Sequence, residues 1–182
     1  MRDEANLEWE QLSEGPPAGF LKVKSRLYRY PDGKEDKWDI LLGGATVAIL
    51  ALTDDDQVIL ARQFRPGPDR VLLEMPGGNV AGAEDIVAAA VRELREETGY
   101  EAEKAEVVMQ TYLASYATHR RHAIVARGCK LVGDQKLDDA EFVDPVLMPV
   151  ADFIEHVLSG QLTDTDMALA GLVSAGFLKP TV

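Results

Sequence analysis

The acidic segment Arg92–Thr98, which reads RELREET, carries the residues of this sequence that are best suited to chemistry. Glu93 lies three residues before Glu96 and four before Glu97, so on a helix the three carboxylates project near one another. Like charges at this spacing destabilise a bare helix by roughly 0.2–0.5 kcal/mol per pair, a cost that a bound divalent cation offsets. Magnesium takes carboxylate oxygens and leaves room for substrate phosphates. The helix alone is explained equally well as a solvated acidic face.

The residues before this segment decide between a metal site and a solvated face. Glu84 follows Gly78 by six residues, and the acidic segment begins eight residues after Glu84 and is followed by Gly99. This spacing resembles the Nudix box, in which glycines, an arginine and four glutamates keep a fixed register. Every charged and glycine position of that pattern is present, and Tyr100 stands where the pattern prefers an aliphatic residue. Glu84 lies near the helix start, where exposed N–H groups favour a carboxylate, so we expect it to be structural.

The resemblance implies a metal-dependent hydrolase and assigns roles to residues of the box. Glu93 and Glu97 would be the main metal ligands, and Glu96 and the carbonyl of Gly77 would complete the set. The implied cofactor is Mg²⁺, with Mn²⁺ as a substitute ion. Two or more ions would bridge the diphosphate oxygens and lower the pKa of an attacking water. Arg92 precedes Glu96 by four residues, a spacing that allows an ion pair to orient the cluster.

Two further segments are similar to the branch of this family that hydrolyses ADP-ribose and nucleotide sugars. They are residues 62–65 with 73–78, which read RQFR and LEMPGG, and residues 159–164, which read SGQLTD. The resemblance implies that Arg65 grips the diphosphate, for which a planar guanidinium is well suited. Glu74 beside it would accept hydrogen bonds from a ribose or base. The alternative for Arg65 is an ordinary surface arginine.

Aromatic residues bear on the nucleoside end of the substrate. Tyr28, Tyr30 and Trp38 are expected either to offer a face to a nucleobase, including across a homodimer interface, or simply to pack a hairpin. Residues 113–122 lack the proline and acid typical of ADP-ribose enzymes, and Tyr116 is instead a feature of some dinucleoside polyphosphate hydrolases. The expected substrate is therefore a nucleoside diphosphate linked to another group, ADP-ribose or a nucleotide sugar. Dinucleoside polyphosphates and nucleoside triphosphates are the alternatives.

Three residues are candidates for the general base. Glu141 lies in a loop that reaches over the metals in this family, and a carboxylate there can take a proton from water. His119 is the second candidate, because an imidazole side chain ordinarily titrates near neutral pH. The alternative is that residues 119–122 form a cationic patch that binds the phosphates of the substrate. We place Glu141 ahead of His119, and Glu96 third. Cys129 falls within an expected strand, so we assign it to the core rather than to nucleophilic catalysis.

Hydrophobic periodicity predicts the elements that position these residues. The expected strands are 20–30 and 38–42 as a hairpin, then 45–52, 58–64, 71–75, 105–113, 122–131 and 142–149. The expected helices are 86–98, ended by Gly99, then 150–158 and 164–177. Residues 1–17 are expected to be an arm or a first edge strand. The order of elements favours an α/β fold with a mixed sheet covered by helices. The resemblance implies the Nudix α/β/α sandwich over residues 43–182, after a small N-terminal β-rich subdomain over residues 1–42.

Composition excludes several other classes of protein. The chain has 182 residues, of which 46% are hydrophobic and 27% charged, as in ordinary globular domains. A net charge of -12 argues against a nucleic-acid or membrane surface, and no apolar run approaches the ~20 residues of a membrane span. The acidic N-terminus lacks the features of a secretory signal, and one cysteine fits a reducing cytoplasm. A non-catalytic nucleotide sensor is a further alternative, but such domains often lose box glutamates that this chain keeps.

Overall fold

A computed structural model describes residues 10–16, 21–139 and 141–179. The chain divides into two compact units, Met1–Gly44 with Tyr112–Arg120, and Ala45–Thr111 with Arg121–Val182. The first unit thus contains the expected N-terminal subdomain, continues to residue 44 and gains the segment 112–120.

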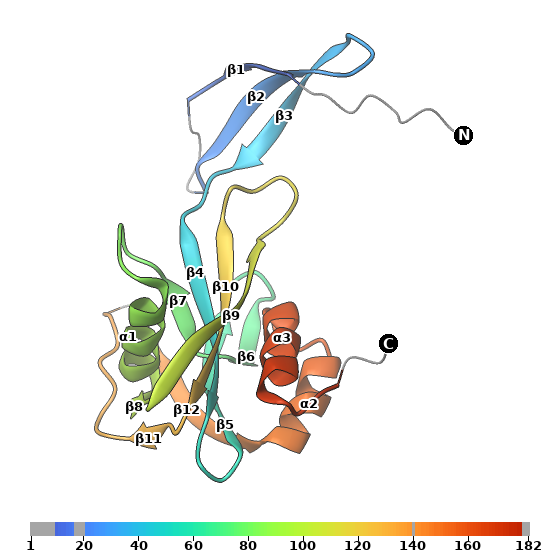
Figure 1. Ribbon diagram of the computed structural model, residues 1–182. Coiled ribbons are helices and arrows are strands. Elements are labelled where there is room, and N and C mark those ends of the chain that lie inside the picture. The colour runs from blue at the N-terminus through green and yellow to red at the C-terminus, as the bar shows by residue number, and fades with distance from the viewer. Residues whose placement is uncertain (1–9, 17–20, 140, 180–182) are drawn as a thin grey trace. The chain divides into compact units, whose positions relative to one another are not determined.

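The first unit is built on a three-stranded antiparallel sheet with the order β1-β2-β3 (Figure 1). Its strands are β1 (Glu10–Glu14), β2 (Val23–Arg29) and β3 (Glu35–Leu41). The predicted hairpin is confirmed, although the second strand begins three residues earlier than expected, and residue 20 of the first lies outside the described residues. The N-terminal segment forms the expected edge strand over residues 10–14, and residues 1–9 and 17 lie outside the described residues.

The second unit is organised around a seven-stranded sheet with the path β12-β5-β4-β10-β9, to which β6 is joined through β5 and β7 through β4. Its strands are β4 (Ala45–Leu52), β5 (Gln57–Arg65), β6 (Arg70–Glu74), β7 (Gly77–Asn79), β9 (Lys104–Tyr112), β10 (Arg120–Arg127) and β12 (Val143–Pro149). A separate two-stranded sheet pairs β8 (Tyr100–Glu101) with β11 (Lys130–Leu131).

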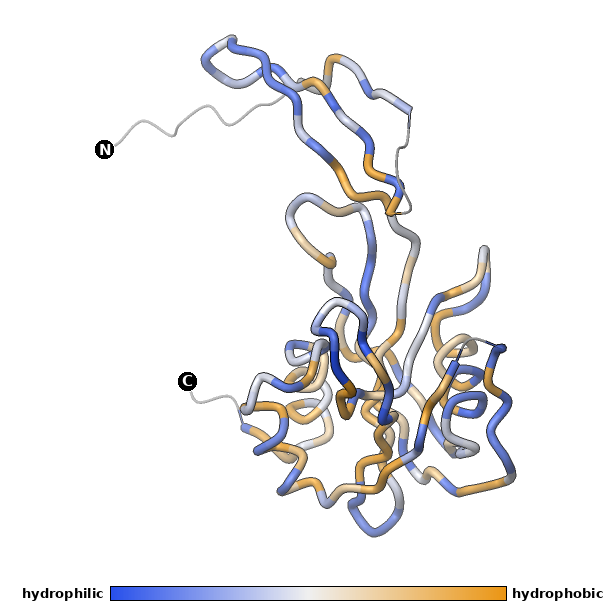
Figure 2. Tube along the Cα trace, turned by 180° about the vertical axis from the view of Figure 1, so that it is seen from behind, coloured by the Kyte–Doolittle hydropathy of each residue, from blue (hydrophilic) through white to orange (hydrophobic). Residues whose placement is uncertain are grey.

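Helices cover both faces of this sheet, as Figure 1 shows, with α1 (Ile86–Thr98) on one face and α2 (Val150–Leu158) and α3 (Thr165–Ala175) on the other. The central strand β4 supplies both cores because successive side chains of a strand point to opposite faces. Ile49 and its alternate neighbours pack with α1, whereas Leu50 and its alternate neighbours pack with α2 and α3. In Figure 2 the hydrophobic stretches follow these strands and helices, and the turn between β4 and β5 is hydrophilic. The predicted α/β sandwich is confirmed.

Helix α1 begins and ends where the sequence predicts. Asp85 is its N-cap residue, and its carboxylate accepts hydrogen bonds from the backbone N–H groups of Val87 and Ala88, both at 3.0 Å. Gly99 follows the helix with a φ of 78°, a left-handed conformation that glycine adopts without steric cost. Asp85 and Gly99 thus set the two ends of α1, and the glutamates of the box lie between these ends.

The structure differs from the sequence prediction over residues 122–131 and over residues 77–79. The single strand expected over 122–131 is wrong, because Gly128 has a φ of 64° and separates β10 from β11. Cys129 therefore lies between strands, although it is buried as expected. The strand β7 was not predicted, since glycines disfavour strands and its pairing with β4 is a long-range contact. Within the described part of the chain, no helix is long and apolar enough to cross a membrane.

Candidate active site

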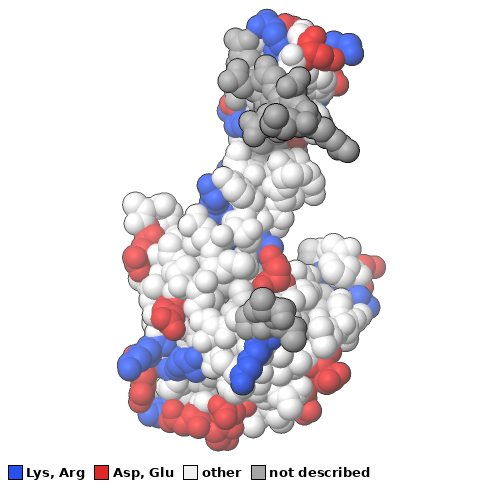
Figure 3. Space-filling view, turned by 45° about the vertical axis from the view of Figure 1, so that its right-hand side comes forward, with Lys and Arg blue, Asp and Glu red and all other residues white. Residues whose placement is uncertain are grey.

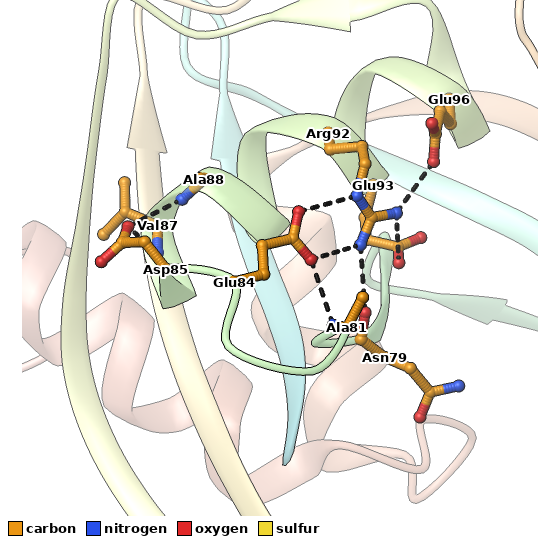
Figure 4. A network of polar contacts seen from close by, with 9 residues as sticks. All are labelled: Asn79, Ala81, Glu84, Asp85, Val87, Ala88, Arg92, Glu93 and Glu96. Carbon is orange, nitrogen blue, oxygen red and sulfur yellow. Dashed lines mark hydrogen bonds and ion pairs between the residues drawn. The ribbon is translucent and has the colours of Figure 1, made fainter. Parts of the chain in front are cut away.

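Arg92 is the centre of the polar network on α1 (Figure 4). Its guanidinium makes five hydrogen bonds, which is the number of its N–H groups. Two go to the carboxylate of Glu84 at 3.0 and 3.1 Å, and one each to Glu93 at 2.9 Å, Glu96 at 3.0 Å and the carbonyl of Asn79 at 3.1 Å. The predicted pair with Glu96 is present. Because every donor is used inside the protein, Arg92 positions carboxylates rather than contacting a substrate.

Glu93 owes its place to the absence of a side chain at residue 78. A Cβ at Gly78 would lie 2.5 Å from the carboxyl carbon of Glu93, well inside contact distance. Burial raises the pKa of Glu93, and its hydrogen bond with Arg92 opposes that rise. The carboxylate is thus held against the backbone of β7 with one oxygen on Arg92.

Glu97 is the most deeply buried carboxylate of the box, with only 4% of the residue exposed. Its Oε2 accepts a hydrogen bond from the backbone N–H of Gly77 at 2.9 Å, which ties α1 to β7. Burial raises its pKa to about 7, and the nearby charges of Glu93 and Glu141 add to the rise, whereas Gly77 and Arg65 oppose it. The main cause is therefore desolvation, and a buried carboxylate with a raised pKa is a candidate for a functional residue.

Glu93 and Glu96 open onto a cavity of about 200 Å³, here called the acidic pocket, whereas Glu97 lies outside its lining. Its lining residues are Gly77, Gly78, Asn79, Arg92, Glu93, Glu96, Lys136, Asp138 and Glu141. Glu141, the first candidate for the general base, therefore faces the same space as two of the expected metal ligands. One of its oxygens accepts a hydrogen bond from the backbone N–H of Asp138 at 3.1 Å.

His119, the second candidate for the base, belongs to the first unit. There its side chain packs so closely on Gly43 that a Cβ at that glycine would lie 2.4 Å away. The two leading candidates are therefore in different units, and the acidic pocket is formed by the second unit alone.

The donor set of the acidic pocket fits a hard divalent cation. Glu93, Glu96, Asp138 and Glu141 line the pocket and offer carboxylate oxygens, which magnesium and manganese prefer, and no cysteine or histidine lines it. Glu93 and Glu96 each use only one oxygen on Arg92. Among the described residues no three acidic, histidine or cysteine side chains already converge on one point. A bound cation could therefore take the second carboxylate oxygen of Glu93 and of Glu96 while Arg92 holds the first.

A second cavity, of about 250 Å³, adjoins the acidic pocket, because residues 77–79 line both. We call it the arginine cavity, since Arg65 and Arg121 line it. Nη2 of Arg65 lies 3.5 Å from Oε2 of Glu74, and its Nε is buried without a hydrogen-bond partner. Arg65 is thus held at a cavity wall beside Glu74, and its planar guanidinium is a group suited to binding an anion.

Glu74 does not have the role that we predicted. The residue is fully buried, and its carboxylate accepts hydrogen bonds from the backbone N–H and the hydroxyl of Thr163. A carboxylate sealed in this way cannot receive a ribose or a base, so the expectation of direct substrate contact is corrected. Glu74 instead links Arg65, through their ion pair, to Thr163 in the segment that precedes α3.

Tyr28, Trp38 and Tyr116 come together in the first unit, as their prediction as substrate-binding residues requires. With Ile40 and Ser115 they line a hollow of about 460 Å³. Tyr30 lies beside them in the hairpin, where its hydroxyl accepts a hydrogen bond from Nε1 of Trp38 at 3.1 Å.

The cationic patch offered as an alternative for residues 119–122 is not formed. Arg120 lies over the ring of Tyr112, 3.6 Å from its centre. Arg121 is paired with two carboxylates of the α3 region. His122 is buried, and its Nδ1 lies 3.2 Å from the carbonyl oxygen of Thr46. Alternation along β10 sends successive side chains to opposite faces, which disperses the charges.

Cys129 is confirmed as a core residue. It is buried, and desolvation raises the pKa of its thiol to about 11. A thiol with this pKa is protonated at neutral pH and is a poor nucleophile.

The fold and the acidic pocket are those of a nucleotide-hydrolysing domain, and comparison with known proteins agrees. The model of the NUDIX domain matches residues 42–166, and the chain belongs to the Nudix family. It is 32% identical to the ADP-ribose pyrophosphatase of Bacillus subtilis over 142 residues, which cover 77% of each chain. It is 31% identical to the ADP-sugar pyrophosphatase of Mus musculus over 171 residues, covering 81% of this chain and 74% of the mouse protein.

A solved structure shares the fold. The crystal structure of an ADP compounds hydrolase superposes with a TM-score of 0.82 and covers 97% of both chains, at 21% sequence identity. The predicted membership of the Nudix hydrolases is therefore confirmed by the sequence, and the predicted fold by both comparisons.

The raised pKa of Glu97 predicts a pH-dependent cost in the metal-free protein. Folded Glu97, whose pKa is about 7, keeps its proton up to about that pH, whereas the unfolded chain releases it near the ordinary pKa of 4.5. Between these values the folded state binds more protons, so stability falls as the pH rises. The variant Glu97→Gln cannot ionise, and we expect it to be more stable than the wild type by about 1–3 kcal/mol at pH 8.

Urea unfolding in a chelator at pH 8 and pH 4.5 measures this effect. The advantage of the variant should fall to about 0.4 kcal/mol at pH 4.5, where folded Glu97 is protonated and the unfolded chain is half protonated at this residue. Glu155→Gln on the exposed side of α2 is the matched control and should show no such dependence. Equal stability of wild type and Glu97→Gln at both pH values would contradict the assigned burial cost.

Proposed function

We propose that this chain hydrolyses the pyrophosphate bond of a nucleoside diphosphate linked to another group, namely ADP-ribose or a nucleotide sugar. The products would be a nucleoside monophosphate and a sugar phosphate, and the cofactor would be Mg²⁺, with Mn²⁺ as a substitute. The observation that carries the proposal is that the acidic pocket and the arginine cavity share residues 77–79. A diphosphate across these residues would meet carboxylate-held cations on one side and Arg65 on the other. The bacterial and mouse relatives, which are named as an ADP-ribose and an ADP-sugar pyrophosphatase, support the same substrate class.

The residues of the second unit divide the work of this reaction. Glu93, Glu96 and Glu97 would hold the cations, and Arg92 would keep Glu93 and Glu96 in place. A bound magnesium ion supplies positive charge to the diphosphate oxygens and makes water more acidic. Arg65, which lines the arginine cavity, would orient the diphosphate through its guanidinium.

Glu141 is the proposed general base, because it lines the acidic pocket. A water oxygen would attack one phosphorus atom while Glu141 takes the proton, and the bond from that phosphorus to the bridging oxygen would break. The bridging oxygen would leave with the other phosphate. No covalent intermediate with the protein is needed.

The first unit is proposed to bind the nucleobase. The hollow lined by Tyr28, Trp38 and Tyr116 offers aromatic faces of the kind on which a base stacks.

We propose that the chain acts as a homodimer in the cytoplasm. A net charge of -12 favours a small-molecule substrate over nucleic acid. On the face drawn in Figure 3 the basic side chains lie in small groups beside acidic ones.

A substrate panel tests the proposal. Purified protein with Mg²⁺ would be given ADP-ribose, ADP-glucose, diadenosine tetraphosphate and ATP, and the phosphorylated products would be identified and counted. We expect AMP and a sugar phosphate in equal amounts from ADP-ribose or ADP-glucose. A clear preference for diadenosine tetraphosphate or ATP would overturn the substrate class and leave the reaction type standing. Binding of these ligands without turnover would favour the nucleotide sensor.

A further inference from the structure

The arginine cavity contains a network of charges that the proposed reaction does not use. Arg121, on β10, donates a hydrogen bond to Oδ1 of Asp164 at 2.6 Å and two to the oxygens of Asp166, both at 2.9 Å. Only 12% of its side chain is exposed. Arg121 and Asp164 line the cavity, whereas Asp166 is outside the set of lining residues. Two members of the network therefore face the space next to the diphosphate position.

Asp164 gives up a favourable local interaction to take part in this network. It is the N-cap residue of α3, a position where aspartate normally accepts hydrogen bonds from the first N–H groups of the helix. Its side chain makes no such bond and pairs with Arg121 instead. Residues that break a local rule in this way are expected at functional sites.

The buried carboxylate of Glu74 anchors the segment that carries Asp164. Thr163, its neighbour in the chain, donates two hydrogen bonds to the fully buried carboxylate of Glu74. Glu74 is also the carboxylate closest to Arg65, at 3.5 Å. The same buried residue therefore fixes both walls of the cavity, Arg65 on one side and Asp164 on the other.

The charge of the network indicates which chemical group it would accept. The positive charge of Arg121 is already neutralised by two carboxylates, and Asp164 adds a carboxylate to the cavity wall, so the network offers no unpaired positive charge to a further phosphate. Hydroxyl groups suit it, because a hydroxyl can donate to a carboxylate oxygen and accept from a guanidinium N–H. The cavity volume of about 250 Å³ suits a single small group.

We propose that Arg121 and Asp164 form a subsite for the hydroxyl groups of an uncharged sugar attached to the diphosphate. The subsite rests on the proposed pyrophosphatase function and deepens it. It selects substrates in which a polyol follows the diphosphate and disfavours those in which another phosphate follows. Neither residue was singled out from the sequence for this role, since Asp164 has the appearance of an ordinary helix cap.

The test compares a substrate that has a sugar with one that lacks it. ADP-ribose and the methyl ester of ADP share the nucleoside and the diphosphate, and ATP carries a third phosphate in place of the sugar. For the variant Asp164→Asn we expect KM for ADP-ribose to rise about tenfold, with kcat nearly unchanged, because one hydrogen bond to a charged group is weakened. KM for the methyl ester should not change.

Asp166→Asn is the matched control, because it removes a carboxylate from the same arginine but not from the cavity lining. It should leave the KM for both substrates unchanged. Asp164→Ser, whose hydroxyl can cap α3, should reproduce the KM effect of Asp164→Asn and guards against a variant that folds poorly.

Each outcome of this test has a defined meaning. A rise in KM for ADP-ribose alone, confined to the Asp164 variants, supports the subsite. An equal rise for the methyl ester, an equal effect of Asp166→Asn, or a preference of the wild type for ATP overturns it and leaves pyrophosphate hydrolysis standing. A wild type that hydrolyses none of the three substrates overturns the proposed function and the subsite together.

Discussion

Glu93→Gln is expected to lower kcat by roughly 10²–10³-fold, since a bound cation supplies several kcal/mol of charge stabilisation and each 1.4 kcal/mol is a factor of ten. Glu93 combines the features required of a metal ligand. It lines the acidic pocket, packs against the bare backbone of Gly78 and has one oxygen held by Arg92. The amide oxygen of glutamine can still accept the hydrogen bond from Arg92, so the fold should persist. Steady-state kinetics in a range of Mg²⁺ concentrations measures the effect.

Two comparisons make this result specific to metal binding. Raising Mg²⁺ should restore part of the lost activity in Glu93→Gln, because the variant keeps the neighbouring carboxylates and is expected to bind the ion more weakly. Glu155→Gln makes the same chemical change on an exposed position of α2 and should leave kcat unchanged. Full activity of Glu93→Gln at low Mg²⁺ would show that this carboxylate does not hold a catalytic ion.

Glu141→Gln should lower kcat by roughly 10²–10⁴-fold with a smaller effect on KM, as expected for removal of a general base. The prediction follows from geometry, because Glu141 lines the acidic pocket together with Glu93 and Glu96. The acidic limb of the pH–kcat profile, which reports ionisation of the base in the complex, should also be lost or displaced in the variant. Rates measured between pH 5 and pH 9 provide both readouts.

His119→Asn is the companion variant, and its effect decides between the two leading candidates. We expect its kcat and pH profile to stay close to those of the wild type. A large loss in His119→Asn, together with a normal profile in Glu141→Gln, would transfer the role of base to the histidine. Losses of similar size in both variants, with the pH limb retained, would point to Glu96 as the remaining candidate.

Local rules of sequence were sufficient for the helix that carries the chemistry. The apolar spacing predicted α1, the glycine at residue 99 predicted its end, and the observed bounds agree. The ion pair of Arg92 with Glu96 follows directly from a spacing of four residues. The structural role expected for Glu84 is consistent with its two hydrogen bonds from Arg92.

These local rules could not predict contacts between residues that are far apart in the sequence. Glu74 and Thr163 are 89 residues apart in the sequence, and nothing in either segment shows that the two residues will be hydrogen-bonded to each other. The pairing of the glycine-rich strand β7 with β4 has the same origin, since it depends on the tertiary position of both. The remaining hydrogen bonds of Arg92, to Glu93 and the carbonyl of Asn79, depend on side-chain direction and on a turn rather than on spacing.

The central claim is that the carboxylates of α1 hold divalent cations beside a diphosphate. The most direct measurement is anomalous diffraction from crystals grown with Mn²⁺ and an ADP-ribose analogue whose bridging oxygen is replaced by a methylene group. Our account predicts manganese peaks within bonding distance of Glu93 and Glu97, with the phosphonate oxygens on the same ions. An ordered analogue in the site, with manganese absent from these two carboxylates, would contradict it.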